Sequence, residues 1–249
     1  MTEGTGIPLA AIDVAILAGG LGTRLRPAVS DVPKVLAPVD GRPFLDILAD
    51  WLARQGARRL VLCLGHLADK VIAHIADRPR SPLSMVPVVE PEPLGTGGAL
   101  VFARPQLRSD PVMVLNGDSW IAADLGAFLA FHQKEKVLAS VLCVEVPDAS
   151  RYGRIELTAE GRVSRFIEKE PGPARAGLIN AGVYLLAHEA LEQLHRMRCR
   201  SLERDFLQNC APGTLAAFVC RDASFVDIGT PESLAGAAGI ITGANKEVS

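Results

Sequence analysis

The chain has 249 residues, 49% of them hydrophobic, which is enough for the core of one large domain or two small ones. Its formal net charge of −2 excludes a global positive field that would attract nucleic acid. No apolar run reaches the roughly 18 residues that a membrane span requires, and the apolar stretch 7–18 is interrupted by Asp13 without a basic segment before it. We therefore expect a cytoplasmic protein that binds neither nucleic acid nor membrane.

Apolar runs bounded by Gly, Pro or Asp alternate with helical patterns over the first half of the chain. These patterns predict strands over 12–17, 60–64, 85–89 and 112–115, and helices over 43–55, 67–76 and 98–104. The alternation predicts an α/β fold with a doubly wound, mostly parallel, Rossmann-like sheet that carries helices on both faces.

The pattern changes after about residue 138. Strand-like segments with short turns between them follow one another over 140–146, 153–157, 163–168 and 182–186, and they predict a small antiparallel extension that makes the sheet mixed. A helix over 201–209, a strand over 215–220 and a last helix over 231–241 complete the pattern. No repeat or flexible linker divides the chain, so we expect a single domain over 1–249.

The five cysteines and five histidines are scattered, and no two cysteines form a C-x-x-C pair. This distribution suggests neither a zinc site nor a disulfide framework. We expect reduced, mostly buried thiols and histidines that are structural or exposed.

A glycine-rich turn directly follows the first predicted strand. Its glycines allow a phosphate chain to approach the backbone closely, and successive N–H groups can form an anion-binding nest. A dinucleotide fingerprint would need Gly at position 25, which is Leu, and a P-loop would need a Gly-Lys-Ser/Thr run. The turn instead carries Arg24, whose guanidinium can grip phosphate oxygens. The candidate nucleotide-binding residues here are Leu17, Ala18, Gly19, Gly20, Gly22 and Thr23.

Three further charged residues stand where phosphate chemistry could use them. Lys34 follows Pro33 on a segment that Pro38 also stiffens. Asp118 lies just beyond the predicted strand 112–115, and Asp227 ends another apolar run. Mg²⁺ typically takes one or two protein carboxylates together with phosphate oxygens. Each aspartate taken alone is more often a turn or cap residue.

The run Gly-Gly-Leu-Gly-Thr-Arg-Leu over 19–25, followed by Pro33-Lys34, resembles the hallmark of the sugar-phosphate nucleotidyltransferases, also called NDP-sugar pyrophosphorylases. Val35 stands where that family usually has a proline. The resemblance extends from residue 12 to about 234. It implies an enzyme that joins an NTP and a sugar 1-phosphate into an NDP-sugar with loss of pyrophosphate.

The resemblance also implies the parts of the domain: a nucleotide-binding part over about 12–137, a sugar-phosphate-binding part over about 138–230, and a C-terminal helix to about 242. A homodimer is the expected assembly. The implied catalytic residues are Arg24, Lys34 and Asp118, with Mg²⁺ as the cofactor, held by Asp118 and Asp227.

Further residues match the substrate loops of that family. Glu90, Gly95 and Thr96 belong to a loop that resembles the base-recognition loop. The sugar-phosphate pocket, in which Glu170 separates the usual Glu-Lys pair from its proline, is implied for Asn116, Tyr152, Gly153, Glu168, Lys169, Asn180 and Ala181.

The sugar 1-phosphate is mostly dianionic at neutral pH and can attack the α-phosphorus without a general base. Catalysis is then positioning plus charge neutralisation, with Arg24 and Mg²⁺ at the departing pyrophosphate and with Lys34 and Lys169 on the phosphates. Glu90 and Glu92 place two carboxylates beside the base loop, and one carboxylate can accept both N–H donors of guanine. This predicts a preference for GTP.

Within the family the chain most resembles the D-glycero-D-manno-heptose 1-phosphate guanylyltransferases, which supply GDP-heptose for bacterial surface polysaccharide. Mannose 1-phosphate guanylyltransferases and short uridylyltransferases stay open as alternatives. A catalytically silent subunit that senses NDP-sugars is the non-enzyme alternative. Such relatives usually lose the loop arginine, the lysine or a metal aspartate, and all of these are present here.

Overall fold

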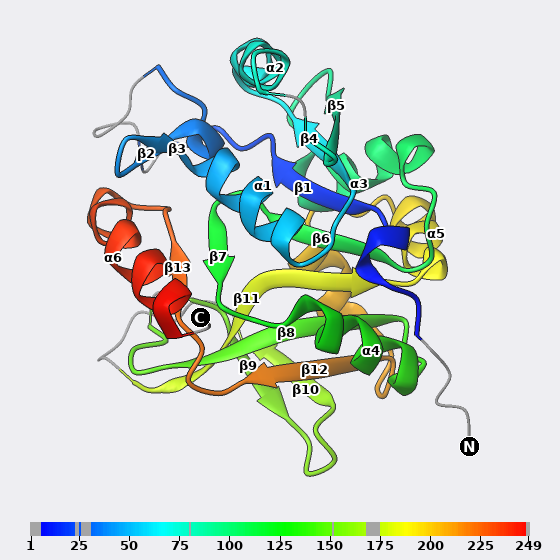
Figure 1. The fold of residues 1–249 in the computed structure, drawn as a ribbon. Coiled ribbons are helices and arrows are strands. Elements are labelled where there is room, and N and C mark those ends of the chain that lie inside the picture. Colours follow the sequence, from blue (N-terminus) through cyan, green and yellow to red (C-terminus); the bar gives the residue numbers. More distant parts are fainter. Residues whose placement is uncertain are drawn as a thin grey trace.

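The structure is a computed structural model that describes residues 6–22, 25, 31–79, 81–150, 152–167 and 175–247. Its centre is a nine-stranded mixed sheet, shown in Figure 1. Four strands of the first half pair in parallel in the order β6-β1-β4-β5, and they confirm the four strands predicted there. Their bounds are β1 Val14–Ala18, β4 Arg59–Leu64, β5 Ser84–Val89 and β6 Val112–Asn116.

The second half of the chain extends the same sheet, mainly with antiparallel strands. β11 pairs antiparallel with β6, β8 and β9, β10 pairs antiparallel with β9, and β12 pairs parallel with β8. The bounds are β8 Ala139–Val146, β9 Arg154–Leu157, β10 Val163–Ile167, β11 Gly177–Leu186 and β12 Leu215–Cys220. The predicted α/β class, with a mixed sheet and an antiparallel extension, is confirmed.

β11 begins five residues before the strand predicted over 182–186. The predicted strand begins only at Gly182, because glycine weakens a strand pattern and the prediction was not extended before it. In the structure Gly182 has a φ of +73°, and the pairing of β11 with β8 shifts register between Asn180 and Val183. The glycine therefore forms a bulge within a longer strand.

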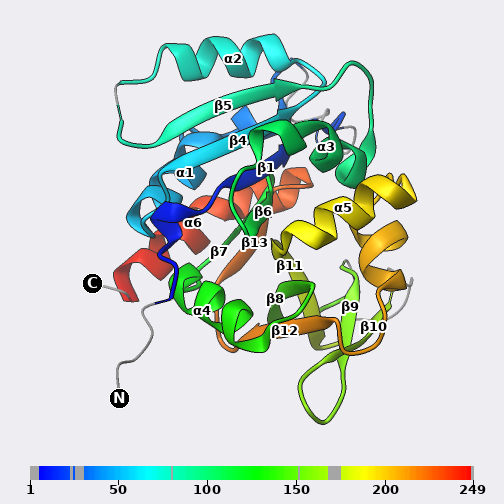
Figure 2. The same ribbon diagram turned by 90° about the vertical axis from the view of Figure 1, so that its right-hand side faces the viewer.

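Helices cover both faces of the sheet (Figures 1 and 2). One face carries α1 Phe44–Arg54, α2 Ala68–Ala76, α4 Leu125–Glu135 and α6 Pro231–Glu247. The other face carries α3 Gly95–Ala103 and α5 His188–Met197. The two faces follow from strand alternation: Val14 and Ile16 of β1 pack into the first layer, and Ala15 packs into the second.

The helix predicted over 201–209 was wrong in type. That segment forms a π-helical turn, η4 Leu202–Phe206, and a 3-10 turn, η5 Leu207–Asn209. The Asp205 carboxylate accepts hydrogen bonds from the N–H groups of Arg200 and Ser201, at 2.9 and 2.8 Å. Such local side-chain bonds compete with the regular α-helical pattern.

Short elements complete the fold. Two minor sheets are formed by β7 Ser119–Ile121 with β13 Phe225–Asp227 and by β2 Pro38–Val39 with β3 Arg42–Pro43. Three 3-10 turns lie at η1 Leu9–Ala11, η2 Lys34–Leu36 and η3 Arg104–Gln106. Among the residues that the structure describes, no helix has the length and apolar character needed to cross a membrane.

Candidate active site

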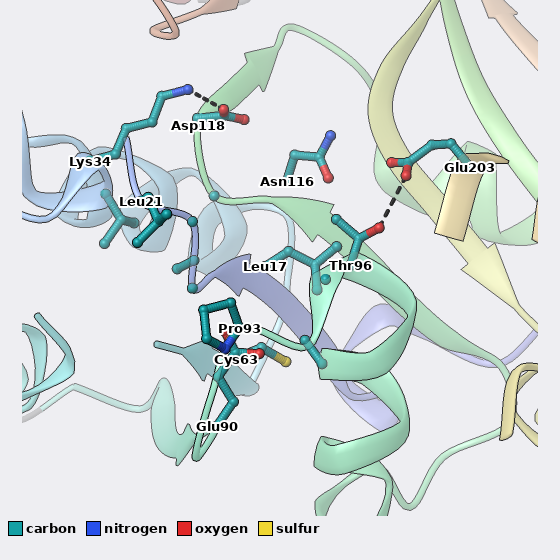
Figure 3. Close-up of a pocket in the computed structure, with 17 residues that line it drawn as sticks. Leu17, Leu21, Lys34, Cys63, Glu90, Pro93, Thr96, Asn116, Asp118 and Glu203 are labelled. Carbon is teal, nitrogen blue, oxygen red and sulfur yellow. Dashed lines mark hydrogen bonds and ion pairs between the residues drawn. The ribbon is translucent and has the colours of Figure 1, made fainter. Parts of the chain in front are cut away.

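A cavity of about 320 Å³ opens at the carboxyl ends of the parallel strands, where ligands bind in open α/β sheets. Figure 3 shows three groups of side chains around it: Lys34 with Asp118, Thr96 with Glu203, and Glu90 with Pro93. Ten of the predicted site residues line it: Leu17, Ala18, Gly19, Gly20, Lys34, Glu90, Gly95, Thr96, Asn116 and Asp118. The fold thus gathers residues from both ends of the predicted nucleotide-binding part.

The glycine-rich turn leaves β1 and packs tightly against Glu90. A Cβ at Gly19 would lie 2.8 Å from Oε1 of Glu90, and a Cβ at Gly65 would lie 2.5 Å from the same oxygen. A side chain at either position would displace the Glu90 carboxylate that lines the cavity, and one at Gly65 would also meet the carbonyl oxygen of Gly19 at 2.8 Å. Gly22 has a φ of +59°, a conformation that glycine adopts without strain. Thr23 and Arg24 lie outside the described residues.

Glu90 follows β5 and turns back over its own loop. Its Oε2 accepts a hydrogen bond of 3.2 Å from the N–H of Leu94, just before α3 begins. Burial raises the pKa of Glu90 and this hydrogen bond lowers it, with a net rise. Burial, with a smaller contribution from the charge of Glu90, raises the pKa of the neighbouring Cys63 thiol to about 12, which makes a nucleophilic thiolate unfavourable. Glu92 is exposed and does not line the cavity.

Asp118 and Asp227 are brought together by the β7–β13 pair. Asp227 pairs with Ser119, and the N–H of Ile228 donates to the carbonyl of Asp118 at 2.9 Å. Lys34, on η2, forms an ion pair with Asp118, and the two side chains are 17% and 29% exposed. The ammonium also lies close to Gly229, since a Cβ there would be 3.3 Å from Nζ.

The two aspartates offer ligands of the type that a divalent cation accepts, and Oδ1 of Asp227 also accepts a hydrogen bond from the N–H of Gly229. Mg²⁺ takes carboxylate oxygens and completes its shell with phosphate oxygens and water. In the described part of the chain, no group of three or more His, Cys, Asp or Glu side chains could hold a metal ion. Lys34 shows that the Asp118 carboxylate attracts a cation at this point.

The remaining wall of the cavity contains a carboxylate that the sequence analysis missed. Glu203 lies on η4, and its Oε2 accepts a hydrogen bond of 3.1 Å from Oγ1 of Thr96. Its segment belongs to the helix predicted over 201–209, and no glycine or proline pattern marks it as a site. Seven lining residues were not predicted: Leu21, Val35, Cys63, Pro93, Ala99, Gly117 and Glu203.

Several residues expected in the sugar-phosphate pocket do not line this cavity. Tyr152 packs edge-on against Phe225, with ring centroids 5.7 Å apart. Asn180 uses both side-chain groups within the protein, donating to Tyr184 at 2.6 Å and accepting from the N–H of Gly182 at 2.8 Å. Gly153 is exposed and Ala181 is buried.

The positions of Glu168 and Lys169 lie outside the described residues. Asp227 does not line the cavity; it lies at the end of β13, opposite Ser119 and next to the Asp118 segment.

Comparison with known proteins agrees with this architecture. A mannose-1-phosphate guanylyltransferase of Mycobacterium tuberculosis is 34% identical over 235 residues, which cover 93% of this chain and 65% of that protein. The chain therefore spans just under two thirds of that relative. A D-glycero-alpha-D-manno-heptose 1-phosphate guanylyltransferase of Aneurinibacillus thermoaerophilus is 33% identical over 226 residues, which cover 89% of this chain and 94% of the relative.

The fold is also that of solved structures. HddC from Yersinia pseudotuberculosis, complexed with GMP-PN, superposes with a TM-score of 0.82 at 35% identity, covering 92% of this chain and 98% of that one. The family described as Nucleotidyl transferase matches residues 14–242, which include every described residue of the cavity. The chain belongs to the nucleotidyl transferase family.

Proposed function

We propose that the chain is a sugar-1-phosphate guanylyltransferase that joins GTP and D-glycero-D-manno-heptose 1-phosphate into GDP-heptose with release of pyrophosphate. One observation carries the proposal: the glycine-rich turn, Lys34 and Asp118 line the same cavity, with Glu90 and the start of α3 on another side. Guanylyltransferases are the relatives named above, and HddC is described in complex with GMP-PN.

The cavity suits an in-line displacement at phosphorus. A sugar 1-phosphate oxygen forms a bond to the α-phosphorus of GTP, and the bond from that phosphorus to the bridging oxygen of pyrophosphate breaks. Because the phosphate oxygen is already anionic, no side chain has to remove a proton. The protein contributes position and positive charge, and the backbone of Gly19 and Gly20 allows the phosphates to approach closely.

Among the residues that the structure describes, Lys34 is the cationic side chain that lines the cavity and can contact the reacting phosphates. Its ammonium stands at the cavity, where it can turn from Asp118 to a phosphate oxygen. Arg24 and Lys169 keep the roles that the family resemblance implies, at the departing pyrophosphate and at the sugar phosphate.

Asp118 and Asp227 would hold the divalent cation, which we take to be Mg²⁺. When bound, it neutralises charge that develops on the phosphate oxygens. Asp118 directly precedes β7 and Asp227 ends β13, so the β7–β13 pair brings the two segments together before any ligand arrives.

The guanine preference rests on Glu90, a cavity-lining carboxylate whose Oε2 accepts from the N–H of Leu94 just before α3 begins. An ionised carboxylate accepts the N1–H and the exocyclic amine of guanine together, whereas uracil and thymine offer one ring N–H. Because Glu90 is only partly buried, leaving it half-paired by the wrong base should cost about 1–1.5 kcal/mol, which corresponds to roughly tenfold in selectivity.

The test is a pyrophosphate-release screen of GTP, UTP, dTTP and ATP against a panel of sugar 1-phosphates that includes heptose, mannose and glucose. The expected result is turnover with GTP and heptose 1-phosphate, at least about tenfold above the other nucleotides. Faster turnover with mannose 1-phosphate would select the mannose alternative, and equal kcat/KM for UTP and GTP would refute the guanine preference.

A further inference from the structure

The carboxylate of Glu203 accepts hydrogen bonds from hydroxyl groups on separate elements of the fold. Its Oε1 accepts a hydrogen bond of 2.9 Å from the hydroxyl of Tyr184 on β11. Its Oε2 accepts from Oγ1 of Thr96 on α3 at 3.1 Å and from Oγ of Ser201 at 3.2 Å. Thr96 and Glu203 are separated by 107 positions in the sequence and both line the cavity.

The direction of each of these hydrogen bonds is fixed. A carboxylate only accepts, so the hydroxyls of Tyr184 and Thr96 must donate to Glu203. Each hydroxyl also accepts a second bond, Tyr184 from Nδ2 of Asn180 at 2.6 Å and Thr96 from the N–H of Leu202 at 2.8 Å. An amide in place of the carboxylate has one acceptor oxygen, so either the buried Tyr184 hydroxyl or the Thr96 hydroxyl would face an NH₂ group instead of an acceptor.

The segment before Glu203 is pressed against the first turn of α3. A Cβ at Gly95 would lie 2.4 Å from the carbonyl oxygen of Arg200, and one at Gly97 would lie 2.8 Å from that of Cys199. The N–H of Gly97 donates to the carbonyl of Arg200 at 2.8 Å. Backbone packing and the Glu203 carboxylate therefore fix the start of α3 together.

Tyr184 connects the same carboxylate to the other half of the site. The ring is fully buried in β11, and the Asn180 amide that donates to it also accepts from the N–H of Gly182 at the bulge. A Cβ at Gly182 would lie 2.7 Å from Nδ2 of Asn116, which lines the cavity. Burial, and then the charge of Glu203, raises the pKa of Tyr184 well above its usual value, whereas the hydrogen bonds from Asn180 and Asn116 lower it.

We propose that Glu203 is a positioning residue that holds the nucleotide side of the cavity, through Thr96, against its sugar-phosphate side, through Tyr184. This inference rests on the proposed function, because the two sides are named for the two substrates. Glu203 performs no chemical step. Its carboxylate sets the relative position of the two walls, and hence of the two reacting phosphates.

The first test reads the network without any substrate. The chain contains two tyrosines, Tyr152 and Tyr184, so ¹³Cζ-tyrosine NMR gives two resonances that a Tyr152→Phe variant assigns. Glu203→Gln should shift the Tyr184 resonance and leave that of Tyr152 in place. Glu189→Gln, the same substitution at an exposed position of α5, should move neither. An unchanged Tyr184 resonance in Glu203→Gln would overturn the inference.

The second test is kinetic. Thr96→Val should raise chiefly the KM for GTP, with Thr96→Ser restoring it, and Tyr184→Phe should raise chiefly the KM for the sugar 1-phosphate. Glu203→Gln should raise both KM values and lower kcat/KM about tenfold or more, the loss expected for one hydrogen bond to a charged group. Adding Tyr184→Phe to Glu203→Gln should raise the KM for the sugar 1-phosphate little further, because both substitutions break the same hydrogen bond between Tyr184 and Glu203.

The outcomes separate the two proposals. If Glu203→Gln changed the thermal midpoint and neither KM, Glu203 would be a structural residue and the inference would fail. If Glu203→Gln did not fold, side-specific KM effects of Thr96→Val and Tyr184→Phe would support the inference, and equal effects on both substrates would refute it. If the wild type turned over no pair of substrates, the proposed function would fail while the NMR test still decided the role of Glu203.

Discussion

Lys34→Met removes the ammonium group that pairs with Asp118 and lies beside Gly229. In the unliganded protein this ammonium competes with any divalent cation for the same carboxylate. We predict that Lys34→Met binds Mn²⁺ or Mg²⁺ more tightly than the wild type in the absence of nucleotide, although its turnover falls because a phosphate loses its cation.

The magnitude follows from the contact. A hydrogen bond to a charged group is worth about 1.5–3 kcal/mol. Because the Lys34 and Asp118 side chains are 17% and 29% exposed, solvent screening places this pair near the lower end. With about 1.4 kcal/mol for each factor of ten, the metal affinity should rise roughly tenfold.

Calorimetric titration of the nucleotide-free protein with Mn²⁺ measures this change directly. Lys134→Met, at an exposed position of α4, is the matched control because it lowers the net charge by the same amount. Equal metal affinity in the wild type and Lys34→Met would refute the competition, and equal tightening in Lys134→Met would assign the effect to net charge alone.

Three further predictions test other parts of the molecule. Asp118→Asn or Asp227→Asn should nearly abolish Mg²⁺-dependent turnover and leave the circular dichroism spectrum unchanged; a variant that keeps most of its rate would remove that residue from the metal site. Since burial raises the pKa of Glu90, the KM for GTP should increase as the pH falls through that raised pKa. Glu90→Gln should show a high KM with a weaker pH dependence over the same range, measured by initial rates. Asp13→Ala should lower the free energy of unfolding by about 2–4 kcal/mol in urea titrations, because it leaves Arg59 without its buried partner at 2.6 Å; a loss below about 1 kcal/mol would contradict this account.

The chain's local patterns determined most of the fold. Short apolar runs that alternate with helical patterns are typical of buried strands in a parallel sheet, so β1, β4, β5 and β6 and their parallel arrangement could be predicted from the sequence. The glycine-rich turn could be placed as well, because it directly follows β1. Its proposed role in phosphate binding could also be predicted, because glycines without side chains let phosphates approach the backbone closely. Helices α4 and α5 were not predicted. Both pack against the sheet, through residues such as Phe128 and Leu191, and the apolar stripe of α5 was a local signal that the prediction overlooked.

Tertiary structure alone decided which charged groups meet. The assignment of Asp118 and Asp227 to one metal comes from the family resemblance and stays a proposal, and the pairing of β7 with β13 explains how two segments so far apart in sequence come together. Glu203 gave no local signal, because its role depends on the hydroxyls of Thr96 and Tyr184, which lie on other elements. Periodicity within a segment records which face is buried, but it carries no information about the distant partner that a buried polar group requires.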